Sequence, residues 1–157
     1  MTGAGSTNGI GSYILFMVAG TTYALRSGEV RHMEMIEDIT RVPNAPPFID
    51  GVVFSRGQVV PVVNLRARFG FERAGVDLRS RLIVVQSSAR MIGLVADAAR
   101  EFVNIPPDAI QPPNDALAGM SGRYVEGIAS IGDRLILVLS LDRILNFAEA
   151  QTVGLAD

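Results

Sequence analysis

The residues that could carry chemistry in this chain are few and lie far apart. His32 is the single histidine, and the chain contains no cysteine and no tryptophan. No HExxH motif or paired-ligand spacing surrounds His32, so a metal or general-base role has no partner residues. Without cysteine, a disulfide, a cysteine-ligated zinc site, an iron–sulfur cluster and a thiol nucleophile are excluded. We therefore expect no metal site and no cofactor, with His32 at an interface or in the core.

Two further patterns resemble catalytic arrangements but lack an essential part. Ser55 follows an apolar run, yet Val53 stands where the GxSxG nucleophile elbow requires glycine, and a second strand is expected to follow instead of a helix. Asp97 and Glu101 lie four residues apart after an expected strand, which a solvated strand end also explains. The sequence therefore predicts no catalytic residues and a protein that is not an enzyme.

Charge and hydropathy exclude two further classes. The formal net charge is -2, and the 14 basic residues are scattered among acidic ones, which argues against nucleic-acid binding. Apolar runs such as Leu135–Leu139 are much shorter than the ~20 residues of a membrane span. The apolar run near the start has no preceding basic residue, as a signal peptide would have. We therefore expect no direct membrane insertion.

The elements that would position these residues are mostly short strands, because apolar runs alternate with turn residues. The expected strands are Tyr13–Ala19, Tyr23–Leu25, Val30–Ile36, Gly51–Ser55, Gln58–Leu65, Arg81–Gln86, Met91–Ala96, Phe102–Ile105, Tyr124–Ile131 and Leu135–Leu141. Two short helices are expected at Leu65–Phe69 and Leu141–Phe147, where apolar residues recur every three to four positions. The pattern predicts an all-β fold.

An internal repeat refines this prediction. Residues 51–69 (GVVFSRGQVVPVVNLRARF) align without a gap on residues 127–145 (GIASIGDRLILVLSLDRIL), each with two strands and a helix start. Pro61 stands where the second copy has Leu137, and proline inside a strand indicates an edge or a bulge. We expect a pair of small β-barrels in one domain, residues 13–148, between a flexible tail at 1–12 and a second tail at 149–157.

Residues 44–65, NAPPFIDGVVFSRGQVVPVVNL, resemble the signature of CheW-like domains, and the resemblance extends over residues 12–147. It implies two five-stranded SH3-like barrels that share a hydrophobic core. It also implies a non-enzymatic adaptor that binds the regulatory domain of a CheA-like histidine kinase and the cytoplasmic tip of a chemoreceptor. The location implied is cytoplasmic, at receptor clusters on the inner face of the membrane. A small-molecule-binding or enzymatic β-barrel is the alternative.

The resemblance also implies a partner-binding site. By position, its members are Val30, His32, Gly51, Arg56, Gly57, Gly93 and Phe102. The family usually has glutamate at the position of His32, so we expect a neutral imidazole to accept a hydrogen bond from Arg56 instead. Gly51 and Gly57 have a second explanation, since tight bends also require glycine. The loop Gln111–Leu117 resembles one that joins adaptor and kinase, but it lacks an aromatic residue.

Overall fold

The computed structural model describes residues 11–113 and 122–147. The expected tails therefore lie outside the described residues, except for Gly11 and for Ser12, which already begins the first strand. The loop expected at 111–117 is described only as far as Pro113. No helix among the described residues has the length and apolar character that crossing a membrane requires.

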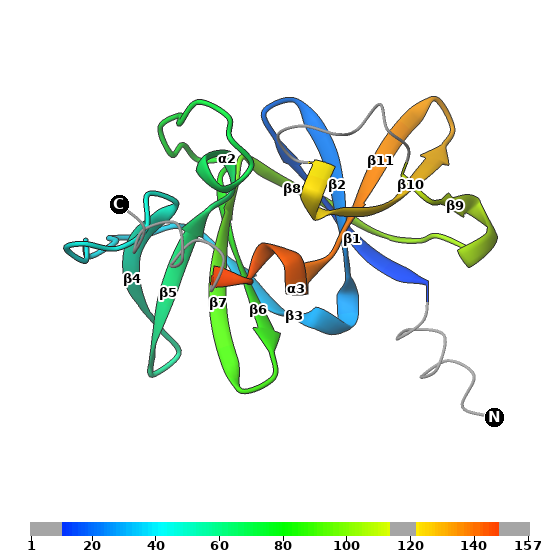
Figure 1. Cartoon of the computed structure of the whole chain (residues 1–157). Helices are drawn as coiled ribbons and strands as arrows, with labels where there is room; N and C mark the ends of the chain where they lie inside the picture. Colours follow the sequence, from blue (N-terminus) through cyan, green and yellow to red (C-terminus); the bar gives the residue numbers. More distant parts are fainter. Residues whose placement is uncertain (1–10, 114–121, 148–157) are drawn as a thin grey trace.

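Two β-sheets form the two lobes of the molecule (Figure 1). The six-stranded sheet has the order β8-β1-β2-β11-β10-β9. Its strands are β1 (Ser12–Val18), β2 (Thr21–Arg26), β8 (Ala98–Asn104), β9 (Ile110–Gln111), β10 (Val125–Ile131) and β11 (Arg134–Leu139). The five-stranded sheet has the order β3-β6-β7-β5-β4. Its strands are β3 (Val30–Glu34), β4 (Ile49–Ser55), β5 (Gln58–Asn64), β6 (Arg81–Ser87) and β7 (Arg90–Ala96).

The two halves of the chain exchange strands between the sheets. β1 and β2 join β8 to β11 from the second half, whereas β3, β4 and β5 join β6 and β7. In each sheet the halves meet in one parallel pair, β2 with β11 or β5 with β7, and in one antiparallel pair, β1 with β8 or β3 with β6. Short 3-10 helices lead into β3, β9 and β10, at Ser27–Glu29 (η1), Pro107–Ala109 (η2) and Gly122–Tyr124 (η4). Each sheet therefore needs strands from both halves.

The duplicated hairpin-plus-helix unit predicted from the sequence is confirmed. Helix α2 spans Leu65–Arg68 and α3 spans Leu141–Ile144, an offset of 76 residues (141 minus 65, and 144 minus 68). Both helices begin after a polar residue, Asn64 or Ser140, whose side chain accepts a hydrogen bond from a backbone N–H of the first turn. Such an N-cap replaces a hydrogen bond that the helix start lacks.

Pro61 accounts for a difference between the two copies. In the second copy, Leu137 pairs with Tyr23 across the parallel β11–β2 contact. In the first copy, β5 pairs with β7 only from Val62 to Asn64, so pairing stops beside Pro61. Proline has no N–H to donate to a neighbouring strand. Pro61 therefore lies where this side of β5 becomes open, as the sequence predicts.

The largest apolar cluster lies between the sheets and explains why β1 is an unbroken apolar run. Alternate residues point to opposite faces of a strand; Ile14 and Phe16 enter the shared cluster, whereas Tyr13 and Leu15 enter a smaller one inside the six-stranded sheet. A third cluster fills the five-stranded sheet. Four successive aromatic rings cross the shared cluster, with centroids 6.1, 5.1 and 5.4 Å apart: Phe16, Tyr23, Phe69 and Tyr124.

The all-β prediction and the pair of SH3-like barrels are confirmed, with local differences. β8 begins at Ala98 instead of Phe102, because small residues there still pair with β1. β9 extends one sheet to six strands; its two residues are too few to give a periodic pattern. α3 ends at Ile144 instead of Phe147.

Candidate functional site

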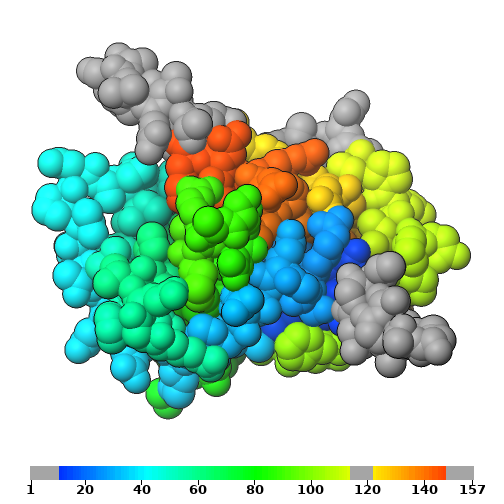
Figure 2. Space-filling model, turned by 90° about the horizontal axis from the view of Figure 1, so that it is seen from below, coloured from blue at the N-terminus to red at the C-terminus, as the bar shows by residue number. Residues whose placement is uncertain are grey.

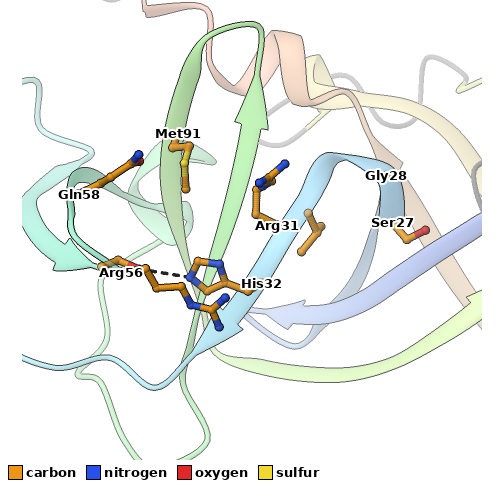
Figure 3. A pocket seen from close by; sticks show the side chains of 9 residues that line it. Ser27, Gly28, Arg31, His32, Arg56, Gln58 and Met91 are labelled. Carbon is orange, nitrogen blue, oxygen red and sulfur yellow. Dashed lines mark hydrogen bonds between the residues drawn. The ribbon is translucent and has the colours of Figure 1, made fainter.

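A hollow lies at one end of the five-stranded sheet, between β3, the β4–β5 hairpin and β7 (Figure 3). Its volume is about 450 Å³. We call it the arginine hollow, and it is lined by Ser27, Gly28, Val30, Arg31, His32, Ser55, Arg56, Gln58 and Met91. Three of the seven residues predicted for partner binding, Val30, His32 and Arg56, are therefore brought together here.

The hairpin turn places Arg56 at the rim of the hollow. Ser55 and Gln58 form the last cross-strand pair, and the two residues between them, Arg56 and Gly57, have φ values of 50° and 83°. Positive φ at both central residues is the mark of a type I′ turn, which matches the twist of a hairpin. Glycine adopts this conformation freely, but arginine rarely does. In the second copy Gly132 takes the position of Arg56, so the arginine is not there for the turn itself.

His32 contacts a carboxylate and a hydroxyl instead of Arg56. Its Nε2 lies 2.7 Å from Oε2 of Glu34 and 3.2 Å from Oγ of Ser55. Glu34 is two residues along the same strand and therefore on the same face. The expected hydrogen bond from Arg56 is not found, because Nε2 of His32 faces Glu34 and Ser55 instead. The dashed line in Figure 3 marks the contact between His32 and Ser55.

This cluster of serine, histidine and glutamate does not have the geometry of a nucleophile. In a catalytic triad the two imidazole nitrogens face different partners, so that the acid orients the ring and the ring activates the hydroxyl. Here one nitrogen, Nε2 of His32, faces both other groups, and Ser55 donates its proton to Glu34 at 2.8 Å. The three side chains form a closed hydrogen-bonded set that fixes the floor of the arginine hollow.

Arg31 and Arg56 remain available to a partner. Both side chains line the hollow, and within residues 11–113 and 122–147 neither has an ion pair or a side-chain hydrogen bond. Arg31 lies on β3 next to His32, and Figure 3 shows it from the opposite wall to Arg56. Sequence reasoning missed Arg31; it lies at a shift of register between Val30 and His32, which the sequence does not signal.

Gly51 and Gly93 are buried and are not among the residues that line the hollow. Cross-strand pairing places them in one row of the sheet, Gly51–Val62–Gly93–Val84–His32. A Cβ on Gly51, whose φ is 144°, would lie 2.0 Å from the carbonyl oxygen of Thr40. A Cβ on Gly93 would lie 2.7 Å from a methyl carbon of Leu82. Both glycines are thus required by packing, and any effect on a partner is transmitted through the sheet.

Phe102 is separate from the other predicted residues. It lies on β8, an edge strand of the six-stranded sheet, and is 62% exposed. It is not among the residues that line the arginine hollow. The seven predicted residues therefore lie in four places. Three line the hollow, Gly57 is in the hairpin turn, Gly51 and Gly93 are in the buried row, and Phe102 is on a second surface.

Glu29 lies in the 3-10 helix that leads into β3, and both burial and neighbouring charges change the pKa of its carboxyl group. Burial raises the pKa of Glu29, Arg26 lowers it, and the nearby carboxylates of Glu126 and Asp142 raise it further. Arg26 is itself engaged by Glu126 in an ion pair. One oxygen of Glu29, Oε1, is buried without a hydrogen-bond partner among the described residues. Among the residues that the structure describes, no group of three or more histidine, cysteine, aspartate or glutamate residues could hold a metal ion.

Comparison with known proteins gives a consistent result. The family model for the CheW-like domain matches residues 12–149. A chemotaxis protein CheW from Rhizobium meliloti is 30% identical over 145 residues, which cover 92% of this chain and 94% of the relative. The chemotaxis protein CheW of Klebsiella aerogenes is 25% identical over 150 residues, covering 96% and 90%. Protein FrzA of Myxococcus xanthus is 32% identical over 121 residues, covering 74% and 73%.

A solved structure extends the similarity to three dimensions. The crystal structure of scaffolding protein TtCheW from Thermoanaerobacter tengcongensis superposes with a TM-score of 0.80 at 31% sequence identity. The superposition covers 87% of this chain and 93% of that protein.

Proposed function

Because this chain belongs to the CheW-like domain family, we propose that it is the adaptor that couples a CheA-like histidine kinase to chemoreceptors in a two-component signalling pathway. The family consists of non-enzymatic scaffold and adaptor proteins. The observation that carries the proposal is the match over residues 12–149, which includes both barrels and every residue of the arginine hollow.

The two lobes offer different surfaces for two partners. We assign the arginine hollow to the helical tip of a chemoreceptor, since Val30, His32 and Arg56 converge there. The part of the kinase that binds this chain is its regulatory domain, which is itself a CheW-like double barrel in this family. An adaptor of this kind works in the cytoplasm at receptor clusters, on the inner face of the membrane. No feature of the described residues favours the alternative of a small-molecule-binding or enzymatic barrel.

The test is a binding experiment with purified components. Calorimetry should detect separate binding of the chain to the regulatory domain of a CheA-like kinase and to the signalling domain of a chemoreceptor from the same genome. Interfaces of about 1,200 to 2,000 Å² range from micromolar to picomolar affinity, so dissociation constants weaker than nanomolar are compatible with the proposal. A ternary complex should form in gel filtration when all three are mixed. Absence of binding to every such kinase of the genome would refute the proposal.

A further inference from the structure

Among the described residues, the chain crosses from one sheet to the other at two places. The first crossing is η1 (Ser27–Glu29), which joins β2 to β3, and the second is Asp97, which lies between β7 and β8. Each crossing contains one carboxyl group on a partly buried residue, Glu29 or Asp97. A change of charge at a crossing therefore acts on a segment that connects the two lobes.

The two carboxyl groups differ in their hydrogen-bond partners. Asp97 accepts hydrogen bonds from the backbone N–H of Ala19 at 2.8 Å and from Arg66 at 2.7 Å. Oε1 of Glu29 is buried and accepts no hydrogen bond from the residues that the structure describes. A buried carboxylate oxygen without a donor loses its hydration and gains no compensating interaction. The charged form of Glu29 is therefore poorly accommodated in η1, whereas that of Asp97 is well accommodated.

The charges around Glu29 also disfavour its carboxylate. The titratable groups that face it from neighbouring elements are Arg26 of β2, Glu126 of β10, Asp142 of α3 and, through Arg26, Tyr13 of β1. Arg26 is the only cation among these groups, and it already forms an ion pair with Glu126. β6 also lies against η1, but its single titratable residue, Arg81, is at the other end of the strand. Two carboxylates therefore face Glu29 around one shared guanidinium group.

A proton on Glu29 removes most of this cost. A neutral carboxyl group is not repelled by Glu126 or Asp142, and it is less costly to bury than a carboxylate. η1 packed against β1 and β6 should therefore hold the proton more tightly than η1 detached into solvent. By linkage, the free energy that keeps η1 packed is largest below the ordinary pKa of 4.5 and is lost as the pH rises through the raised pKa of the packed form.

We propose that Glu29 is a pH-dependent switch at the first crossing: η1 stays packed against β1 and β6 when the carboxyl group is protonated and detaches more often when it is charged. Ser27 and Gly28 of the same crossing line the arginine hollow, so the switch determines how often this wall of the hollow is formed. Asp97 should keep the second crossing in place over the same pH range, because its pKa is lowered instead. The switch belongs to the free protein and does not depend on the proposed adaptor function.

Hydrogen exchange of backbone amides tests the switch in the full chain without any partner. The peptide that covers η1 is followed by mass spectrometry from about pH 5 to about pH 7.5, and each rate is compared with the intrinsic rate at that pH to give a protection factor. The peptide that covers Asp97 is the internal reference. Glu29→Gln is a permanently neutral analogue of the protonated side chain, and Asp142→Asn removes one facing charge. Glu37→Gln, at an exposed position, is the matched control.

In the parent, protection of η1 should fall severalfold as the pH rises, by at most about tenfold per pH unit, which is the limit for one proton. Protection at Asp97 should stay constant. Glu29→Gln should keep η1 protected at every pH, Asp142→Asn should weaken the pH dependence, and Glu37→Gln should behave like the parent. If Glu29→Gln does not fold, the parent and Asp142→Asn still decide the matter. Constant protection of η1 in the parent, or the same pH dependence in parent and Asp142→Asn, would overturn the inference and leave the adaptor function untouched.

Discussion

Nε of Arg68 donates a hydrogen bond to the carbonyl oxygen of Ile144 at 2.9 Å, and the two residues occupy equivalent positions in the duplicated unit. The Arg68 guanidinium also donates to the carbonyl oxygen of Asn146 at 3.2 Å and lies 4.3 Å from the ring centroid of Phe48. The last carbonyl groups of a helix have no partner within the helix. Arg68 therefore joins the end of α2 to the end of α3, which extends from one lobe towards the other (Figures 1 and 2).

Removal of this link should destabilise the whole fold. We expect Arg68→Ala to lower the free energy of unfolding by about 2 kcal/mol, from lost hydrogen bonds and lost contact with the aromatic ring. Arg68→Lys keeps the charge but loses the forked donor geometry, so it should recover only part of this loss. Urea denaturation measures both, with Arg79→Ala as a surface control. Equal stability of Arg68→Ala and parent would show that the link contributes nothing.

Asp97 provides a second link, and its effect should depend on pH. It accepts hydrogen bonds from the backbone N–H of Ala19 at 2.8 Å and from Arg66 at 2.7 Å. Burial alone would raise the pKa of Asp97, but these hydrogen bonds and the charge of Arg66 together lower it below the ordinary value of 3.8. The stabilisation is therefore full above that value and is lost as the pH falls through the lower pKa of the folded protein.

We expect Asp97→Asn to lower the free energy of unfolding by about 1 kcal/mol at neutral pH, a modest value because the pair is partly exposed. The difference from the parent should persist down to about pH 5 and shrink below about pH 4. Urea denaturation at several pH values tests this. A difference that grows on acidification would contradict the assignment.

At Glu29 the pH dependence of the free energy of unfolding should have the opposite sign. Burial raises the pKa of Glu29 in the folded protein, so the folded state holds the proton more tightly than the unfolded state and stability falls as the pH rises from the ordinary value of 4.5. At neutral pH the charged carboxylate is therefore a cost, and Glu29→Gln should be neutral or stabilising by up to about 1 kcal/mol. Glu37→Gln, at an exposed position, is the control. A clear loss of stability in Glu29→Gln would contradict this account.

The three glycines of the predicted site should respond differently to alanine. Gly51→Ala places Cβ against the backbone of Thr40 and should cost about 3 kcal/mol or more. Gly93→Ala meets only a side chain, that of Leu82, and should cost about 1 to 3 kcal/mol. Gly57→Ala has nothing within 4 Å and carries only the strain of a positive φ, about 1 kcal/mol. Thermal unfolding ranks the three, and any other order would reject the packing explanation.

His32→Glu tests the relationship between His32 and Glu34. The new carboxylate would face Glu34, so we expect a loss of about 1 kcal/mol in the free energy of unfolding at neutral pH. The loss should disappear in a Glu34→Gln background, and a double-mutant cycle isolates this coupling. If His32→Glu is instead more stable than the parent in both backgrounds, pairing with Arg56 outweighs repulsion from Glu34.

The sequence alone determined the architecture, because local patterns of residues specify the strands and the repeated unit. Apolar runs between turn residues define the strands, and the repeat between residues 51–69 and 127–145 specifies two hairpin-plus-helix units whatever their later packing. The absence of cysteine and the isolation of His32 likewise excluded most catalytic chemistry. The signature at residues 44–65 pointed to the family that the comparisons then showed.

Only the tertiary structure decided which side chains of the site contact one another, because these contacts depend on how the strands pair. β3 and β4 are the two edge strands of the five-stranded sheet. Closure of this sheet into a barrel brings Glu34 and His32 of β3 to Ser55 of β4, although Glu34 and Ser55 lie 21 positions apart in the sequence. The strand pairing also places Gly51 and Gly93 in one row of the sheet, and Arg31 and Arg56 have no ion pair within the part of the chain that the structure describes. A shift of one residue would turn every side chain of a strand to the other face. The apolar pattern of each strand fixes its buried face, but which polar side chains then meet depends on strands that are far apart in the sequence.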